Sequence, residues 1–310
     1  GTRINYDMPG TRSLFTAAGR KARGGIEPPY RDAILAMDKD WGDPQLWSVM
    51  RQASSPYTAN FYLAAMDMTR DENGDIVRVA EQQRVYLMLF MRTLWLSLVI
   101  TFTTFVLGFP IAHLLATLPM RKSNLLMILV LLPFWTSLLV RTTAWMVLLQ
   151  QQGVVNDVFV WLGIIRDDQR LQMIYNQTGT IIAMTHILLP FMILPLYSVM
   201  RTINPSYVRA ARSLGATSWT AFRRIYFPQT LPGLGAGALL VFILAVGYYI
   251  TPALVGGSSG QLISNLIAMH MTRTLNWSMA AALAAMLLGG VLILYWVYDR
   301  LVGIDNLKLG

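Results

Sequence analysis

The segment Tyr207-Val-Arg-Ala-Ala-Arg-Ser-Leu-Gly-Ala-Thr-Ser-Trp-Thr-Ala-Phe-Arg-Arg-Ile-Tyr-Phe-Pro228 is a short basic stretch enclosed by apolar sequence. The runs Leu171–Met200 before it and Ile225–Thr272 over and beyond its end contain no Asp, Glu, Lys or Arg. Each run is longer than the roughly 20 apolar residues that a helix needs to cross a bilayer. The segment is therefore expected to be a loop between two membrane-spanning helices.

Two short helices are predicted within this loop. Ser206–Leu214 is expected to be the first, and Gly215 ends it, because glycine readily adopts the left-handed conformation that follows many helix C-termini. Ser218 is expected to cap a second helix that runs to Phe227, where Pro228 prevents continuation. The loop is thus expected to form a helix–glycine–helix hairpin.

One face of the second predicted helix is aromatic. Trp219, Phe222 and Tyr226 have the i, i+3, i+7 spacing of a single helical face, and Arg223 and Arg224 lie off it. Exposed aromatic side chains on a hairpin at the membrane surface suit the docking of a soluble partner. An interfacial helix lying on lipid is the alternative interpretation.

The composition of the whole chain agrees with a membrane protein. Of its 310 residues, 55% are hydrophobic and 13% are charged, whereas soluble domains carry about 25% charged residues. Cysteine is absent, which excludes disulfides, thiolate nucleophiles and Cys-ligated metals. The sequence predicts an all-α, polytopic bundle with five spans, at 88–118, 124–149, 178–200, 234–255 and 278–299.

The distribution of Lys and Arg predicts the orientation of these spans, because short cytoplasmic loops are enriched in both. The 119–123 loop, the 201–233 loop and the C-terminus hold nine of them, and the opposite short loops hold three. The nine are Arg121, Lys122, Arg201, Arg209, Arg212, Arg223, Arg224, Arg300 and Lys308. These loops are assigned to the cytoplasm. The net charge of +9 therefore reflects membrane topology rather than nucleic-acid binding.

Four parts of the chain follow from this topology. Residues 1–25 are expected to be a basic N-terminal tail, and residues 26–87 an extracytoplasmic segment. Residues 88–303 are expected to form the transmembrane domain, with the cytoplasmic loop 201–233 inside it. Residues 304–310 are expected to be a cytoplasmic C-terminal tail.

The cytoplasmic loop resembles the EAA signature of permease subunits of ABC importers. That signature reads Glu-Ala-Ala, three residues, Gly, nine residues, Ile, one residue, Leu-Pro. At these positions the chain has Ala210-Ala211, Gly215, Ile225 and Pro228, and it departs from the pattern at Arg209 and Phe227. The resemblance implies a fold of the type I importer permease kind.

Further stretches are similar to the spermidine/putrescine-type branch, over roughly residues 85–303. They are Leu132-Pro-Phe-Trp-Thr-Ser137, Val140-Arg-Thr-Thr-Ala-Trp145, Leu189-Pro-Phe-Met-Ile-Leu-Pro-Leu-Tyr197, Tyr249-Ile-Thr-Pro-Ala-Leu-Val-Gly-Gly257 and Asn276-Trp277. Such permeases have six spans, and the first is expected near Gly24–Ile26, where this sequence has no apolar run.

The resemblance implies a complex located in the bacterial inner membrane. Its expected partners are a second permease subunit, two cytoplasmic ATPase subunits, an extracytoplasmic solute-binding protein, membrane lipid and a small-molecule substrate. The chain lacks Gly-x-x-x-x-Gly-Lys-Ser/Thr, so ATP and Mg are expected on the ATPase, with no catalytic, cofactor or metal site here. The expected ATPase-coupling residues are Arg209, Ala210, Ala211, Gly215, Trp219, Phe222, Ile225 and Pro228.

The candidate translocation path is formed by Arg141, Trp145, Tyr248 and Tyr249. Arg141 is a full charge inside a span region, which favours a role in a cavity, with snorkelling to the outer interface as the alternative. The aromatic residues could stack on a cationic substrate or simply pack. The resemblance implies a polyamine substrate, although none of the spans contains Asp or Glu before Asp299 that could bind a dication. Selectivity could then reside in the binding protein or the partner permease, or the substrate could be another compound, such as an opine-like or anionic one.

Two rival functions share parts of this pattern. Gly257-Ser-Ser-Gly260 fits the Gly-x-Ser-Gly of intramembrane serine proteases, with His186 or His270 as the base of Ser259. A secondary transporter or channel working alone is the other rival, but it would have no need for the 206–228 hairpin.

Overall fold

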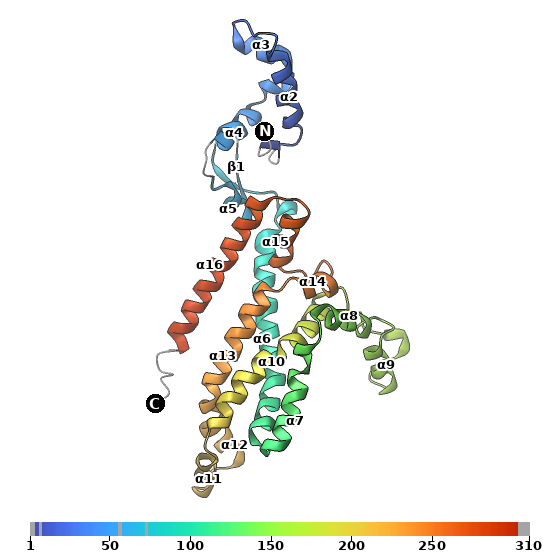
Figure 1. The fold of residues 1–310 in the computed structure, drawn as a ribbon, viewed down its shortest axis with the longest axis vertical. Coiled ribbons are helices and arrows are strands. Elements are labelled where there is room, and N and C mark those ends of the chain that lie inside the picture. The colour runs from blue at the N-terminus through green and yellow to red at the C-terminus, as the bar shows by residue number, and fades with distance from the viewer. Residues whose placement is uncertain (1–3, 6–7, 55–57, 72–73, 303–310) are drawn as a thin grey trace. The chain divides into compact units, whose positions relative to one another are not determined.

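The computed structural model describes residues 4–5, 8–54, 58–71 and 74–302, and the chain divides into two compact units, Gly1–Leu87 and Met88–Gly310. The helices of the second unit are long, and those of the first are short (Figure 1). Each unit has its own buried apolar residues. The division coincides with the boundary expected between residues 87 and 88.

The first unit consists of short helices and one β-hairpin. Its elements are α2 (Thr11–Ala22), α3 (Tyr30–Met37), η1 (Lys39–Gly42), α4 (Pro44–Ser54), α5 (Asn60–Ala65), β1 (Met68–Arg70), β2 (Ile76–Arg78) and η2 (Glu81–Gln83). The two strands are antiparallel, with Thr69 opposite Val77. The hairpin is an addition to the all-α architecture that the sequence predicts.

A buried cluster joins the N-terminal helix to the rest of this unit. Leu14 of α2 packs with Trp41 and Leu46, and the rings of Phe15 and Trp41 meet edge to face at 5.3 Å. Residues 1–25 and 26–87 are therefore parts of one folded unit. The division at residue 25 into a tail and an extracytoplasmic segment stays a prediction.

The first long helix begins at a carboxylate that is distant in sequence. Asp67 is 3% exposed and accepts hydrogen bonds from the backbone N–H groups of Val85, Tyr86 and Leu87, at 3.2, 3.1 and 2.9 Å. A helix N-terminus leaves its first N–H groups without intrahelical partners, and a negative charge there also suits the helix dipole. Asp67 thus caps α6, although no local sequence pattern indicates it.

The second unit is all-helical apart from its loops. Its elements are α6 (Tyr86–Thr117), α7 (Met120–Leu131), η3 (Leu132–Trp135), α8 (Leu138–Leu148), α9 (Val154–Trp161), η4 (Asp167–Gln169), α10 (Gln177–Thr202), α11 (Pro205–Ser213), α12 (Ser218–Ala221), η5 (Phe222–Tyr226), α13 (Phe227–Gly247), α14 (Ile250–Val255), α15 (Ile263–Thr272) and α16 (Trp277–Val302).

Within the described part of the chain, four helical segments are long and apolar enough to cross a membrane, or five if one bent pair counts as a span. The four are Tyr86–Thr117, Gln177–Thr202, Ser218–Gly247 and Trp277–Arg300. The polytopic helix bundle expected from the sequence is confirmed. Two predicted spans are nevertheless interrupted, each for a local reason.

The predicted span 124–149 is not straight. Met120–Trp135 and Leu138–Leu148 meet at 97°. Pro133 lies in the 3₁₀ turn before the bend, and Thr136 and Ser137 have extended backbone conformations that no helix can hold. The predicted span 234–255 also ends early, because α13 stops at Gly247 and a separate short helix, α14, follows.

Small residues allow the two central helices, α10 and α13, to pack closely along one another (Figure 1). A Cβ atom at Gly233 would lie 2.9 Å from the Pro195 carbonyl oxygen, and one at Gly237 would lie 2.9 Å from Met192 Sδ. Glycines four residues apart on one face let helix backbones approach closely in a membrane. The largest buried cluster lies around this contact, with Met184, Leu188, Leu196, Val241 and Ala245.

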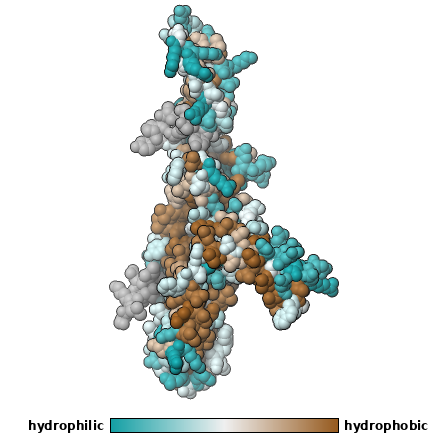
Figure 2. Space-filling model, turned by 45° about the vertical axis from the view of Figure 1, so that its right-hand side comes forward, coloured by the Kyte–Doolittle hydropathy of each residue, from teal (hydrophilic) through white to brown (hydrophobic). Residues whose placement is uncertain are grey.

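Outer surfaces of the second unit are apolar. Figure 2 shows hydrophobic side chains gathered over its middle, and hydrophilic side chains at the lower end, where α11 and α12 lie. On α16, Leu288, Leu292, Ile293 and Trp296 are each more than half exposed. Such a surface suits lipid or another membrane chain rather than water.

We predict that Gly233→Ala destabilises the α10–α13 contact by about 1–3 kcal/mol, because the new methyl group has no space. Thermal unfolding of the purified chain in detergent measures this change. Gly289→Ala on α16 is the control, because a Cβ there meets nothing within 4 Å. Equal melting temperatures for the two variants would contradict the close approach.

Candidate functional site

The first helix of the cytoplasmic hairpin has well-defined ends. At its start the Asn204 side chain accepts a hydrogen bond from the N–H of Ser206 at 2.9 Å, with Pro205 as the first helical residue. At its end, Gly215 has φ +87°, and its N–H donates to the Arg212 carbonyl at 3.0 Å. Ala216 donates to the Ala211 carbonyl at 3.0 Å, which completes a Schellman motif. The left-handed conformation predicted for Gly215 is confirmed.

The second helix differs from the prediction at both ends. Its cap is Thr217, whose hydroxyl accepts from the Thr220 N–H at 3.2 Å, and Ser218 is already helical. The prediction that Pro228 stops the helix is wrong, because helical conformation continues without a break from Ser218 to Gly247.

A π-turn at Phe222–Tyr226 accommodates the proline. The Phe227 N–H donates to the Phe222 carbonyl, five residues back, so the helix is widened just before Pro228. The side-chain amide of Gln229 then donates to the Ile225 carbonyl at 2.7 Å, which gives a further donor to a carbonyl in the widened turn. The widened turn and the Gln229 hydrogen bond together let Pro228 lie inside a continuous helix.

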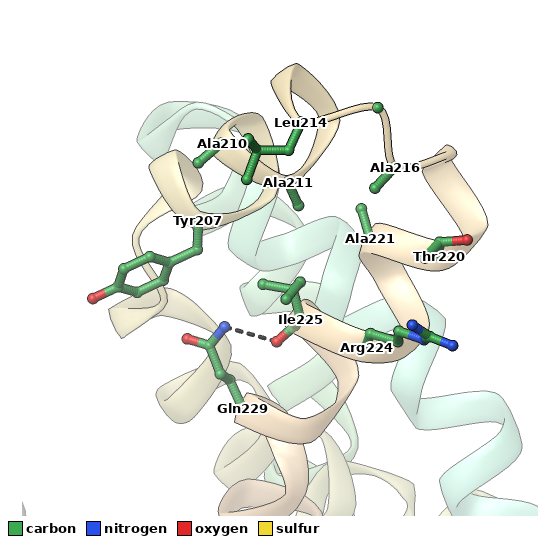
Figure 3. Close-up of a pocket in the computed structure, with 11 residues that line it drawn as sticks. Tyr207, Ala210, Ala211, Leu214, Ala216, Thr220, Ala221, Arg224, Ile225 and Gln229 are labelled. Carbon is green, nitrogen blue, oxygen red and sulfur yellow. Dashed lines mark hydrogen bonds between the residues drawn. The ribbon is translucent and has the colours of Figure 1, made fainter.

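The hairpin encloses a groove of about 830 Å³ (Figure 3). It is lined by Tyr207, Ala210, Ala211, Leu214, Gly215, Ala216, Thr220, Ala221, Arg224, Ile225 and Gln229. Small side chains on α11 and α12 face one another across it, so the space between the helices stays open. Four predicted coupling residues, Ala210, Ala211, Gly215 and Ile225, come together here. Arg209, Trp219, Phe222 and Pro228 lie outside the lining.

The predicted aromatic face mostly turns inward. Trp219 is 67% exposed, and its ring stacks on Phe222 at 5.7 Å, which in turn stacks on Tyr226 at 6.0 Å. Tyr226 is buried and its hydroxyl forms a 2.9 Å hydrogen bond with His113 Nδ1 on α6. Only Trp219 therefore remains an exposed aromatic, because the rest of the row packs against α6.

The candidate path residues lie where interrupted helices meet. The indole N–H of Trp145 on α8 donates to His186 Nδ1 on α10 at 3.1 Å. Arg141 precedes Trp145 by one turn of α8, and the hydroxyl groups of Thr142 on α8 and Thr251 on α14 are 3.2 Å apart. The Arg141 Nε atom is buried and has no hydrogen-bond partner among the described residues.

The break between α13 and α14 is supported from α15. Ser264 Oγ donates to the Tyr248 carbonyl, and Asn265 Nδ2 donates to the Tyr249 carbonyl at 2.7 Å. Tyr249 is 47% exposed, whereas Tyr248 is half-buried. Of the four predicted path residues, Trp145 thus contacts His186, Arg141 lies one turn before it on α8, and Tyr248 lies at the end of α13. Tyr249 points to a more open surface.

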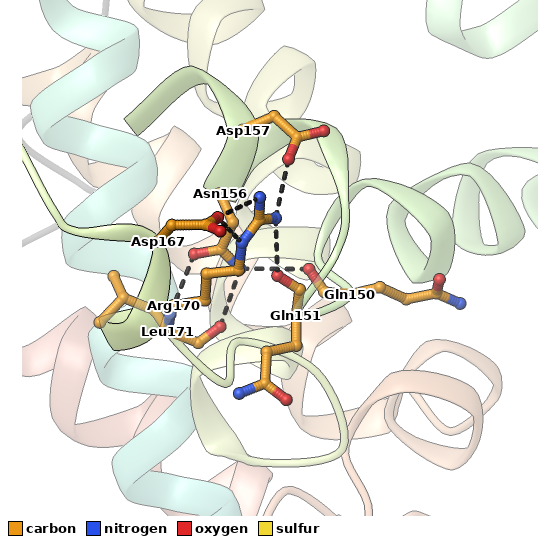
Figure 4. Close-up of polar contacts among 7 residues, drawn as sticks. All are labelled: Gln150, Gln151, Asn156, Asp157, Asp167, Arg170 and Leu171. Atoms are coloured by element: carbon orange, nitrogen blue, oxygen red, sulfur yellow. Dashed lines mark hydrogen bonds and ion pairs between the residues drawn. The ribbon is translucent and has the colours of Figure 1, made fainter. Parts of the chain in front are cut away.

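The loop after α8 is held by two polar side chains that the sequence did not single out (Figure 4). Asn156 is fully buried and bonds both to the Gln150 carbonyl and to the backbone of Leu171. Arg170 pairs with Asp157 at 2.7 Å and with Asp167 at 2.8 Å. Their partners lie up to 19 residues away, so only the fold reveals them.

The Gly257-Ser-Ser-Gly260 stretch has a structural place. Thr180 Oγ1 donates to the Gly260 carbonyl at 3.1 Å, and Arg92 Nη1 donates to the Ser258 carbonyl at 2.8 Å. His186 bonds to Trp145, and the His270 ring bonds to Thr274 at 3.1 Å. The stretch is a tight turn packed on α10 and α6.

Residues 93–302 match the family described as the binding-protein-dependent transport system inner membrane component. The spermidine/putrescine transport system permease protein PotB of Escherichia coli (strain K12) is 36% identical over 221 residues, which cover 70% of this chain and 80% of that protein. PotB of Haemophilus influenzae is 31% identical over 254 residues, covering 80% of this chain and 88% of that protein.

Solved structures share the fold. A chain of a bacterial ABC transporter involved in the import of the acidic polysaccharide alginate superposes with a TM-score of 0.61 at 17% identity, covering 99% of both chains. At this identity the likeness concerns the fold alone.

This chain belongs to the family of binding-protein-dependent transport inner-membrane components. It is a multi-pass permease of the inner membrane and not an enzyme, and ATP is bound by a partner ATPase. The serine protease interpretation is therefore set aside.

We predict that Tyr226→Phe lowers the stability of the purified chain by about 1 kcal/mol, because it removes the hydrogen bond to His113 and keeps the ring stack. Thermal unfolding measures the change. Tyr295→Phe on α16 is the control, since that side chain is exposed. If both variants have the same melting temperature, the Tyr226–His113 hydrogen bond contributes nothing to the stability of the fold.

Proposed function

We propose that this chain is the permease subunit of an ATP-driven importer for a polyamine such as spermidine or putrescine, or a related small solute. An extracytoplasmic solute-binding protein delivers the solute. The chain pairs with a second permease subunit, and two cytoplasmic ATPase subunits drive the cycle. Residues 26–87 lie outside the cytoplasm, and the 206–228 loop engages the ATPase.

The observation that carries this proposal is the grooved hairpin at residues 205–226. α11 is capped at both ends, so it is a rigid element rather than a flexible loop. α12 continues directly into α13, which means that a displacement of α12 moves a whole span. The Trp219–Phe222–Tyr226 row, with its bond to His113, links the same displacement to α6.

The interrupted helices are the proposed site of passage. Discontinuous helices in transporters expose polar groups at membrane depth next to the substrate. Here Arg141 and Trp145 follow the bend between α7 and α8, and Tyr248 lies at the end of α13. A buried guanidinium Nε without a partner is costly unless a cavity or a substrate uses it.

Polyamine as the substrate is supported by the names of the relatives that are 31% and 36% identical. This chain has no acidic residue between Asp168 and Asp299, so its spans offer aromatic faces but no carboxylate to a cation. Selectivity for a polyamine would then come from the solute-binding protein or from the partner permease.

Gly215→Pro is predicted to abolish the stimulation of ATP hydrolysis by the loaded binding protein, while membrane insertion stays normal. Proline cannot adopt φ +87° and cannot donate the hydrogen bond to Arg212. Trp219→Asp should have the same effect at the exposed end of the aromatic row. ATPase assays on the reconstituted complex measure both.

Gly163→Pro is the matched control for this experiment. Gly163 also has φ +69°, and its N–H also donates to a carbonyl three residues back, that of Val160. It lies in the predicted outer loop, so its substitution should leave coupling intact. Stimulated hydrolysis that survives both Gly215→Pro and Trp219→Asp would refute the docking role.

The substrate assignment is tested by calorimetry on the cognate solute-binding protein with a panel of polyamines and amino acids. We expect spermidine or putrescine to bind to the solute-binding protein. In proteoliposomes that contain the whole complex, we expect each polyamine to compete with the uptake of the other. Binding of an amino acid or an anion, with no heat from either polyamine, would replace the substrate and leave the importer assignment standing.

A further inference from the structure

The cytoplasmic hairpin carries only one sign of charge. Residues 201–233 contain five arginines and no acidic residue, and no Asp or Glu occurs anywhere between Asp168 and Asp299. Arg201 is occupied within the fold, because its Nη1 donates to the Ala116 carbonyl at 3.0 Å. The other four are Arg209, Arg212, Arg223 and Arg224, and all are exposed.

Three of these arginines lie behind the groove or on its wall. Tyr207, Ala210, Ala211 and Leu214 line it and follow the i, i+3, i+4, i+7 spacing of one helical face. Arg209 and Arg212 are therefore on the opposite face of α11, one turn apart, and Arg224 lines the facing wall. A partner that receives α11 meets guanidinium groups on the back of the helix and beside the groove.

Like charges one turn apart on a helix repel each other, so this arrangement carries a cost in the isolated chain. Among the described residues, none of these four arginines forms an ion pair, whereas Arg170 in the predicted outer loop pairs with Asp157 and Asp167. In the free chain, solvent and salt screen these exposed charges, and carboxylates of a docking partner would pair with them. Guanidinium groups pair with carboxylates in a bidentate geometry that lysine cannot reproduce.

We propose that the ATPase surface receiving α11 is acidic, and that a carboxylate there pairs with Arg209, with Arg212 beside it. This inference rests on the proposed docking role of the hairpin and adds the chemistry of the partner. In the permeases that this chain resembles, the position of Arg209 is a glutamate. The receiving surface for this chain therefore has the opposite sign of charge at that point.

A protein surface fits the hairpin better than anionic lipid does. Lipid headgroups need only exposed cations, whereas this hairpin also presents a groove of about 830 Å³ with an apolar floor. Leu214 at the end of α11 is 89% exposed. This groove has cations beside it and an exposed leucine at its end. It suits a protein partner that has a complementary shape and acidic residues around the contact.

The test is charge reversal in the assembled complex of permeases, ATPase and solute-binding protein. For Arg209→Glu we expect at least about a tenfold loss of stimulated ATP hydrolysis, because like charges at an interface cost several kcal/mol. Arg209→Lys keeps the positive charge but not the bidentate geometry, so its loss should be smaller than that of Arg209→Ala, which in turn should lose less than Arg209→Glu. Reversal of one acidic residue on the ATPase surface should restore the Arg209→Glu variant.

Arg121→Glu is the matched control, since Arg121 is exposed on α7 in another predicted cytoplasmic loop. Size-exclusion elution and membrane insertion verify that each variant is folded. If Arg209→Glu keeps full stimulated ATP hydrolysis while Gly215→Pro abolishes it, the proposal of an acidic surface is wrong and the docking role stands. If Gly215→Pro is also fully coupled, the docking role itself fails. Equal losses for Arg209→Glu and Arg121→Glu that disappear in neutral-lipid nanodiscs would show that the arginines bind anionic lipid.

Discussion

The second unit is governed by the requirement that backbone N–H and C=O groups inside a bilayer find partners within the protein. Its helices are nevertheless interrupted, and the interruptions fall where side chains supply the missing bonds. Asn265 serves the Tyr249 carbonyl after α13, and Gln229 serves the Ile225 carbonyl in the widened turn. Irregular backbone is thus confined to places that the protein itself supports. These places are also the ones where passage and coupling are proposed.

Rigid contacts connect these irregular places. The glycines of α13 hold it tightly against α10, and the aromatic row from Trp219 to Tyr226 holds the hairpin against α6. α13 therefore packs against α10 along its length, and the aromatic row anchors its cytoplasmic end to α6. Its opposite end, at Gly247, is free of helical constraint because the chain turns there into α14. Such a helix can transmit motion from one face of the membrane to the other.

Features that depend on local pattern could be predicted from the sequence. Span positions follow from apolar length, and the end of α11 at Gly215 follows from glycine's conformational freedom. Features that depend on distant partners could not be predicted. Tyr226 turns inward because His113 is there, and Pro228 is tolerated because Phe222 and Gln229 adjust the hydrogen-bond ladder. The caps and clamps formed by Asp67, Asn156 and Arg170 have no signature in the chain around them. The roles of the coupling and path residues rest on the proposals above.

The π-turn has a consequence for how this chain can change in length. A turn closed by bonds to the fifth residue holds one residue more than an ordinary helical turn. Loss of one residue from 222–226 could therefore relax the turn to regular helix and keep the flanking faces aligned. The same loss in the middle of α10 would rotate the rest of that helix by about 100°. The residues of α10 that pack on α13 would then no longer face it. The widened turn can therefore lose one residue without changing the register of the flanking helix, whereas the spans cannot. Variation in chain length is thus tolerated at this turn without disturbing the bundle.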